Sequence, residues 1–249
     1  MMYSIVFILY SSIPKDNWSN RTRPGYRVCQ ILIMSTNREV YDKIAESWYG
    51  FRHRSRFTTE LEEMAARWRR GKLLNIGCAH GPDFLPFKDN FELWGVDFSA
   101  QMLKLAQKYA AKFDLKVRLT LADATSLPYP DNTFDRAIAV AVYHNIRGDE
   151  QRKEAFRELR RVLRPGGEAF ITVWNKWQPR FWLKGKEVDM PWKSRMKTHY
   201  RYYYLYSYPE LRSLLTGTGF EIVSIFPEKS YRFPLRFLSR NICALVKKR

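Results

Sequence analysis

Apolar and polar positions follow two alternating patterns from Lys72 onward. Short, nearly continuous apolar runs are separated by stretches in which apolar residues recur every three or four positions. The first pattern predicts strands that are buried on both faces, and the second predicts amphipathic helices. The expected strands are 73–76, 93–96, 117–121, 134–142 and 169–174, and the expected helices are 39–48, 57–68, 100–113 and 149–163. Strands separated by helices indicate βαβ units and a parallel sheet.

The C-terminal part of the chain follows a different pattern. A short helix is expected at 209–215, and strands are expected at 221–226 and 242–246. The connection between these strands carries no helical pattern, which favours an antiparallel pair at the sheet edge. The predicted fold class is therefore α/β, with a Rossmann-like, mostly parallel, seven-stranded sheet, helices on both faces and an antiparallel C-terminal edge hairpin. LRPGG at 163–167 is expected to be a turn before the fifth strand.

Residues 1–33 differ in character from the rest of the chain. The apolar run at 4–10 is shorter than the about 20 residues that span a bilayer, and no basic segment precedes it as in a signal peptide. We expect 1–33 to be a peripheral extension, which need not be native, with a short interfacial anchor as the alternative. Residues 34–249 are expected to form the functional domain, with a basic, aromatic insertion at about 176–206.

Charge narrows the range of partners. The chain has 43 Lys and Arg against 25 Asp and Glu, a formal net charge of +18. Such an excess favours a polyanion, although a generally basic proteome would give the same balance. Within 176–204, eight basic residues and two acids are interleaved with Trp, Phe and Tyr. Cations that follow phosphates and rings that stack unpaired bases would suit RNA, whereas rings packed inward would make this a solvated cap.

Cysteine and histidine positions exclude the common metal sites. The three cysteines are far apart, and the four histidines show no ligand spacing. We therefore expect no metal site in this chain. An odd number of cysteines without a secretory signal favours a reducing, cytoplasmic location and no membrane association.

Three successive strand ends carry candidate binding residues. GCAHG at 77–81 follows the first strand, and its glycines Gly77 and Gly81 would let a ligand approach the backbone closely. Asp97 ends the second strand, 20 residues after Gly77, where an acid accepts hydrogen bonds from ribose hydroxyls. Asp123 and Ala124 follow the third strand, where an adenine edge would lie. The GxxxG spacing alone is equally compatible with a structural turn.

This order of motifs over residues 39–249 resembles the class I S-adenosylmethionine-dependent methyltransferases. The resemblance implies S-adenosylmethionine as cofactor, with the glycine loop beside its methionine moiety, Asp97 on the ribose and Asp123 on the adenine. The cofactor-binding residues that it implies are Asn75, Gly77, Cys78, Gly81, Asp97, Phe98, Ser99, Asp123 and Ala124. Two positions depart from the family: Asn75 replaces an Asp, and Ala79 replaces the Gly of GCGxG. These departures predict weaker cofactor binding or an inactive homologue.

Finer features resemble the tRNA wobble-uridine methyltransferases. They are VYDKIAESWYGFR at 40–52, AVYHNI at 141–146, LRPGGEAFITVW at 163–174 and the segment 189–211 with PW and RYYYLY. The resemblance implies esterification of 5-carboxymethyluridine in a tRNA anticodon stem-loop, helped by a small zinc-binding activator protein. Tyr204 stands where that family has His.

A carboxylate acceptor needs orientation more than it needs a base. Arg52 matches the family's N-terminal active-site Arg and would hold the carboxylate bidentately. His144, just past the fourth strand, would hydrogen-bond the acceptor. The remaining substrate-binding candidates are Arg54, Tyr143, Trp174, Arg201 and Tyr202. Arg52 would otherwise contact phosphate, and a lone His often only packs or caps.

Two other functions use the same residues. A methyltransferase acting on a small molecule such as a quinone precursor would carry the same three cofactor motifs. A non-catalytic RNA-binding homologue would explain Asn75 and Ala79.

Overall fold

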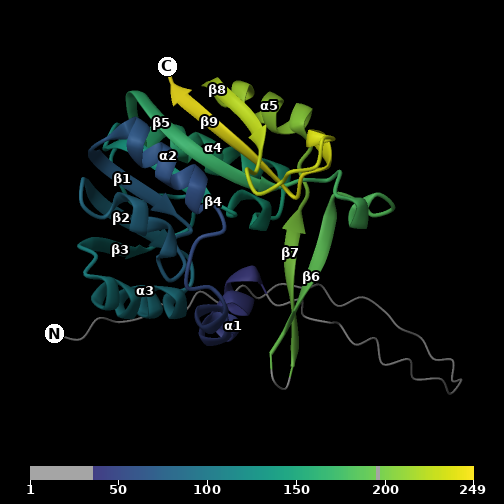
Figure 1. Cartoon of the computed structure of the whole chain (residues 1–249), viewed down its shortest axis with the longest axis horizontal. Coiled ribbons are helices and arrows are strands. Elements are labelled where there is room, and N and C mark those ends of the chain that lie inside the picture. The colour runs from purple at the N-terminus through teal and green to yellow at the C-terminus, as the bar shows by residue number, and fades with distance from the viewer. Residues whose placement is uncertain (1–35, 195–196) are drawn as a thin grey trace, which may run out of the picture. The chain divides into compact units, whose positions relative to one another are not determined.

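A computed structural model describes residues 36–194 and 197–249 (Figure 1), so the expected extension at 1–33 lies outside the described residues. The strands of its main sheet are β1 (Gly71–Ile76), β2 (Phe91–Asp97), β3 (Val117–Leu121), β4 (Phe134–Val140), β5 (Leu163–Trp174), β8 (Phe220–Pro227) and β9 (Asn241–Lys248). The sheet is seven-stranded, in the order β3-β2-β1-β4-β5-β9-β8. The first five strands pair in parallel, and β9 runs antiparallel to β5 and β8. This arrangement confirms the predicted fold class.

Helices cover both faces of the sheet (Figure 1). They are α1 (Asn37–Phe51), α2 (Thr58–Trp68), α3 (Ala100–Phe113), α4 (Asp149–Val162) and α5 (Tyr208–Gly217). Leu73 of β1 packs in a cluster with residues of α2 and α3, such as Leu61. Its neighbour Leu74 packs in a second cluster with residues of α4 and α5, such as Phe156. Because successive side chains of a strand point to opposite faces, the apolar run of β1 is buried on both sides.

The fifth strand begins earlier than the sequence predicts. LRPGG lies inside β5, where the register against β4 shifts between Phe134 and Arg136. Gly166 has a φ of +76° at this irregularity. The expected turn is therefore a bulged start of the strand.

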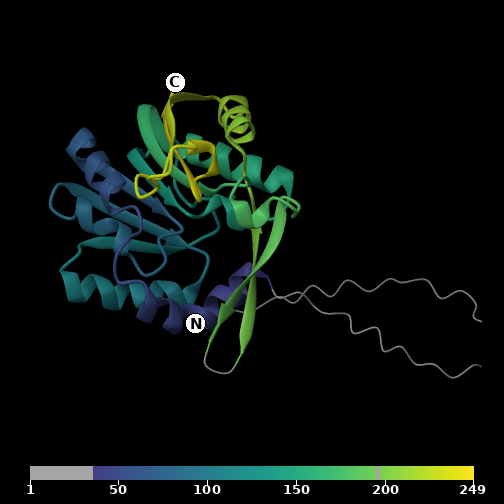
Figure 2. The same ribbon diagram turned by 45° about the vertical axis from the view of Figure 1, so that its right-hand side comes forward.

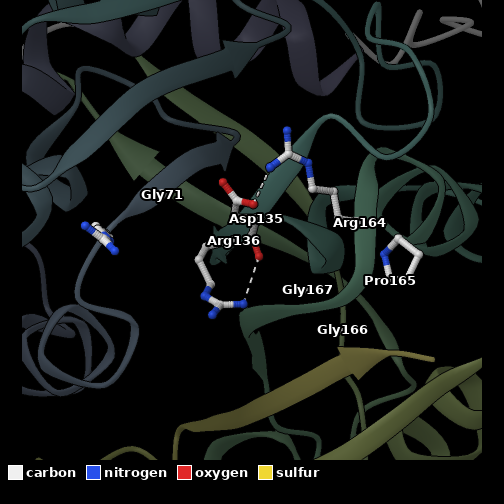
Figure 3. Close-up of a pocket in the computed structure, with 8 residues that line it drawn as sticks. Gly71, Asp135, Arg136, Arg164, Pro165, Gly166 and Gly167 are labelled. Atoms are coloured by element: carbon white, nitrogen blue, oxygen red, sulfur yellow. Dashed lines mark hydrogen bonds and ion pairs between the residues drawn. The ribbon is translucent and has the colours of Figure 1, made fainter.

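A hollow of about 510 Å³ lies at the amino ends of β1, β4 and β5 (Figure 3). Arg70, Gly71 and Pro165 are among the residues that line it. Arg164 donates to the Asp135 carboxylate at 2.6 Å, so part of its basic lining is neutralised internally. Ligands of open parallel sheets bind at the carboxyl ends of the strands, which is the opposite edge. The candidate site is therefore expected at the carboxyl ends of the strands and not in this hollow.

The basic, aromatic insertion forms a separate two-stranded hairpin of β6 (Glu187–Lys193) and β7 (Thr198–Tyr204) (Figure 2). Helix α1 is fastened to it at two points. The Asn37 side chain donates to the Tyr202 carbonyl at 2.9 Å and accepts from its N–H at 2.8 Å. The Trp192 indole N–H donates to the Ser47 hydroxyl at 2.8 Å. Asn37 also donates to the Asn145 carbonyl after β4, so α1 and the hairpin form a joined cap beside the carboxyl edge of the sheet.

Among the helices of residues 36–194 and 197–249, none combines the length and apolar character needed to cross a membrane.

Candidate active site

A turn of small residues follows β1, and its two glycines adopt left-handed backbone angles. The φ angle is +65° at Gly77 and +98° at Gly81. A Cβ atom at Gly77 would lie 2.5 Å from Cγ2 of Val142, so only glycine fits there without displacement. The Cys78 amide donates to the Val96 carbonyl at 2.9 Å, which fastens the turn to β2. The two glycines therefore leave the backbone uncovered by side chains at the point between β1 and β4 where the order of the strands in the sheet reverses.

Asp97 joins this turn to the next two strand ends. Its Oδ2 accepts from the Ala79 amide at 2.8 Å, and its Oδ1 accepts from the Ser99 amide at 2.9 Å. Its carbonyl accepts from the Ala122 amide at 3.1 Å, just past β3. Burial raises the pKa of the Asp97 carboxyl to about 6, despite these N–H donors. The glycine turn and the ends of β2 and β3 therefore form one connected structure, with a carboxylate that is mainly ionised at neutral pH.

Asn75 and Asp123 flank this structure. Asn75 is fully buried, and neither its Oδ1 nor its Nδ2 has a partner among the described residues. A buried amide without protein partners is uncommon, and a polar ligand bound at this turn would complete its hydrogen bonds. Asp123 is exposed, and its Oδ1 accepts from the Thr125 amide and hydroxyl at 2.9 and 2.7 Å. The residues fit an adenosyl ligand with a polar amino-acid end, although the particular contacts remain predictions.

The other predicted cofactor-binding residues lie in the same region. Ser99 is buried and accepts from the Met102 amide at 3.1 Å, so it caps α3. Its hydroxyl donates to Asp42 of α1 at 2.6 Å. The Phe98 ring lies 5.7 Å from the Tyr41 ring of α1. The thiol of Cys78 is buried, and burial raises its pKa. Ala124 is half-buried against the core cluster that includes α4.

Replacing Ala79 by glycine should stabilise the protein. Ala79 has a φ of +46°, a left-handed conformation that costs a non-glycine residue about 1–2 kcal/mol. The extra freedom of glycine in the unfolded chain offsets part of this strain, so we expect a gain of about 0.5–1 kcal/mol in urea unfolding. The control is Ala111→Gly on the exposed face of α3, which should lose about 1 kcal/mol. Equal losses in the two variants would contradict the strain at Ala79.

Two arginines without acidic partners lie beside this region. Arg201 of β7 is 6% exposed, and its Nη1 donates to the Tyr203 hydroxyl at 2.7 Å. Arg52, at the end of α1, places its guanidinium 4.4 Å from the Trp48 ring. The Nε atoms of both arginines are buried without partners, and neither forms an ion pair within the part of the chain described. Burial lowers the pKa of Arg52, and the nearby charges of Arg56 and Arg201 lower it further.

His144 completes this cluster as a neutral side chain. It is 1% exposed, and its ring lies 4.6 Å from that of Tyr203 and 5.7 Å from that of Trp174. Burial lowers its pKa to about 3, with contributions from Arg201 and Arg52. Its Nδ1 has no partner among the described residues. His144 therefore offers one N–H donor at neutral pH and does not act as a cationic acid.

Aromatic rings surround the two guanidiniums. Trp192 lies 5.0 Å from Trp48, and the Arg201 guanidinium lies 5.1 Å from the Trp192 ring. Trp174 lies 4.6 Å from Tyr203 on the other side. These rings supply flat faces for a planar acceptor.

Arg201 and Tyr202 are both predicted from the sequence to bind substrate, but they point to opposite faces of β7. Arg201 and Tyr203 share one face of β7. Arg201 donates to the Tyr203 hydroxyl, and the Tyr203 ring lies beside that of His144. Tyr202 faces the other way, where Arg147 lies 4.1 Å from its ring. Tyr204 is on that second face and donates to the Glu210 carboxylate. Tyr203 therefore lies beside Arg201 and His144 whereas Tyr202 does not, and the role of Tyr202 in binding substrate remains a prediction. The period of two along a strand would have indicated this difference had the strand been recognised.

Two further candidates lie apart from the cluster. Tyr143 is fully buried, and its ring stacks 4.1 Å from that of Phe156 in the core. Arg54 is exposed in the connection between α1 and α2. The structure brings neither side chain together with Arg52, Arg201 and His144, so their roles in binding substrate remain predictions.

His80 is a site residue that the sequence did not single out. It is fully buried, and its Nε2 hydrogen-bonds the carbonyl oxygen of Arg52. Burial lowers its pKa to about 4, so the ring is neutral and Nε2–H donates. The Tyr109 hydroxyl donates to the next carbonyl, that of His53, at 2.8 Å. His80 of the glycine turn thereby positions Arg52, which lies 28 residues earlier in the sequence. No local sequence pattern indicates this contact.

Comparisons with known proteins agree with this geometry. A family model described as a methyltransferase domain matches residues 73–167. The ubiquinone/menaquinone biosynthesis C-methyltransferase UbiE of Azotobacter vinelandii is 31% identical over 208 residues, covering 74% of this chain and 79% of that protein. The CcbJ methyltransferase of Streptomyces caelestis shares the fold, with a TM-score of 0.67 at 18% identity over 86% of this chain and 98% of that one.

The chain belongs to the class I S-adenosylmethionine-dependent methyltransferases. A more specific likeness is to the mouse tRNA (carboxymethyluridine(34)-5-O)-methyltransferase ALKBH8, which is 28% identical over 165 residues. This match covers 64% of this chain and spans about a quarter of the mouse protein, 24% of its length.

Proposed function

We propose that this methyltransferase esterifies the carboxylate of 5-carboxymethyluridine at the wobble position of tRNA. The observation that carries the proposal is the pair Arg52 and Arg201, whose buried Nε atoms lack partners. Arg201 is buried and Arg52 is half-buried, and the charge of Arg52 acts on the buried Asp83 carboxyl without forming an ion pair. A bidentate carboxylate would satisfy the unmade Nε hydrogen bonds and supply a direct counter-charge. A neutral acceptor would leave both guanidiniums uncompensated.

The reaction requires alignment more than proton transfer. S-adenosylmethionine supplies an electrophilic methyl group when bound, and a carboxylate oxygen takes it without losing a proton. Arg52 and Arg201 hold the carboxylate, His144 donates one hydrogen bond, and Trp48 and Trp174 flank the base. The cap of α1 and the hairpin keeps water out, so proximity and desolvation supply the rate enhancement.

The basic composition supports a tRNA over a free acid as substrate. The net charge of +18 suits a polyanion, and the mouse relative is named as a tRNA methyltransferase. We include in the proposal a cytoplasmic location and a small zinc-binding activator protein. Strand β3 is an open sheet edge with Leu121 50% exposed, which is the kind of edge that a partner covers.

Methyl transfer should be insensitive to pH between about 7.5 and 8.5 at saturating substrate, a range in which Asp97, with its pKa raised to about 6, is also ionised. The His144 pKa is lowered to about 3, so the ring is neutral throughout this range, and a carboxylate acceptor is ionised throughout it. Initial rates with labelled cofactor measure this. A rate that falls as pH decreases from about 8.5 to 7.5 would show a titrating base and contradict the mechanism.

The direct test of the proposed function is tritium transfer from labelled cofactor to tRNA. The tRNA is taken from cells that make carboxymethyluridine, its existing esters are hydrolysed under mild alkali, and an activator protein is supplied. We expect label in one nucleoside after digestion, and renewed alkali should release it as volatile methanol. Label that resists alkali would indicate methylation of carbon or nitrogen, and the absence of label in tRNA would contradict the proposal.

A small-molecule activity is the second candidate, because UbiE is similar over most of its length. The same labelled cofactor, offered with quinol precursors and followed by organic extraction, tests it. Extractable label together with unlabelled tRNA would favour this function.

A further inference from the structure

Two segments leave the main sheet at the same point, beside the candidate active site. β5 ends at Trp174, which pairs with Asn241, the first residue of β9. The ribbons of β5 and β9 lie side by side in Figure 1. The segment 176–184 follows β5, and the segment 229–240 precedes β9. We call these two segments together the flanking surface.

A single buried asparagine holds the two segments against each other. Asn175 donates from Nδ2 to the carbonyl oxygens of Phe237 and Ser239, at 2.6 and 2.8 Å. Its backbone N–H donates to the Arg240 carbonyl at 3.0 Å. Its Oδ1 accepts from the Trp177 amide at 3.1 Å. The hydrogen bonds of Asn175 therefore fix the position of segment 176–184 relative to segment 229–240.

Large apolar side chains of the flanking surface face solvent. Trp177 is 46% exposed, Trp182 is 55% exposed and Phe237 is 51% exposed. Phe233 and Leu235 are also exposed. Exposing this many apolar rings to water is unfavourable in free energy, and such exposure is typical of a binding surface.

The same surface is strongly basic. Residues 176–184 and 229–240 contain seven Lys and Arg and no Asp or Glu. Two of these cations are neutralised, Lys229 by Glu63 and Arg240 by Glu228. The other five form no ion pair with the described residues; they are Lys176, Arg180, Lys184, Arg232 and Arg236. Unpaired cations interleaved with exposed rings suit a single strand, with its phosphates on the cations and its bases on the rings.

The flanking surface is continuous with the acceptor site. The Arg180 guanidinium lies 4.6 Å from the Trp174 ring, and that ring lies 5.7 Å from His144. Burial lowers the pKa of Arg180, and the nearby charges of Arg240 and Arg56 lower it further. These cations are therefore close to one another. A nucleotide chain that places one base at His144 would therefore continue directly over Arg180.

We propose that the flanking surface binds single-stranded RNA, namely the nucleotides next to the methylated one, with bases stacked on Trp177, Trp182 and Phe237. This inference rests on the proposed function for the identity of the RNA. The C-terminal segment 229–240 thereby contributes to substrate binding, together with the hairpin insertion.

Fluorescence anisotropy of a labelled anticodon stem-loop, measured on the full chain without cofactor, tests the inference. Trp177→Ala and Phe237→Ala should each weaken binding at least about fivefold, because each lost stack is worth about 1–3 kcal/mol. The double variant R232Q/R236Q should lower the slope of log affinity against log salt by about 1.4, because two phosphate contacts are lost. Lys116→Gln, exposed just before β3, is the matched control and should change neither quantity.

Cofactor affinity by calorimetry shows whether each variant is folded, and it should remain within about twofold in all of them. RNA binding unchanged in Trp177→Ala, Phe237→Ala and R232Q/R236Q would overturn the inference. Phosphatidylserine vesicles whose binding alone is lost in these variants would overturn it in favour of a membrane surface. Because anisotropy needs no turnover, loss of RNA binding supports the inference even where tRNA methylation fails.

Discussion

Arg52→Ala and Arg201→Ala should each lower the rate of methyl transfer by about 100-fold or more, while cofactor affinity stays within about twofold. Each guanidinium presents a buried Nε without a partner, and neither forms an ion pair with the described residues. A charged hydrogen bond contributes about 1.5–3 kcal/mol, and a bidentate pair loses two of them. Single-turnover rates with labelled cofactor measure the first quantity, and calorimetry with S-adenosylhomocysteine measures the second.

Two comparisons sharpen this result. Arg52→Lys keeps the charge but loses the planar fork, so it should recover only a small part of the lost rate. Arg38→Ala removes an exposed arginine near the start of the same helix, α1, and should leave single-turnover chemistry nearly unchanged. Wild-type rates in Arg52→Ala would remove Arg52 from the mechanism, and a parallel loss of cofactor affinity would show that its role is structural.

Gly77→Ala should have the largest effect on the cofactor site. The φ of +65° is unfavourable for alanine, and the new Cβ would lie 2.5 Å from Cγ2 of Val142. Backbone strain and overpacking each cost about 1–3 kcal/mol, so we expect a loss of about 2–4 kcal/mol in the free energy of unfolding. The turn must also move relative to Asp97, so affinity for S-adenosylhomocysteine should fall at least about tenfold. Urea unfolding and calorimetry measure the two changes.

The chain offers a matched control for this substitution. Gly217, at the end of α5, has nothing within 4 Å of an added Cβ, and Gly217→Ala should raise stability by up to about 1 kcal/mol. The double variant G77A/V142A removes the contact but keeps the strained φ, so it should recover part of the loss. Wild-type stability and affinity in Gly77→Ala would contradict the described turn.

The sequence predicts the central sheet well because its strands are buried on both faces. Runs such as 73–76 and 93–96 have no competing helical period, and both are strands in the structure. The hairpin β6–β7 carries no such signal, because Pro191 interrupts it and its two faces are both aromatic. The turn at 163–167 is a bulge in β5, because pairing with β4 continues on both sides of it.

The cofactor site is partly predictable because its elements are local. A glycine turn after one strand and an acid at the end of the next are readable as short motifs, and Asp97 indeed accepts the Ala79 amide. The arginine pair is different, since Arg52 and Arg201 are brought together only by α1 packing on the hairpin. Whether Tyr202 or Tyr203 faces the arginines depends on recognising β7 as a strand, which the sequence does not allow.

We expect one adenosyl ligand to be held by the turn at 77–81, Asn75, Asp97 and Asp123, next to Arg52 and Arg201. A crystal structure of the protein with S-adenosylhomocysteine tests it most directly. We expect the ligand to lie across the carboxyl ends of β1, β2 and β3, with its amino-acid end satisfying Asn75 and its sulfur facing the two arginines. A ligand bound elsewhere, such as in the basic hollow at the amino ends of β1 and β4, would contradict it.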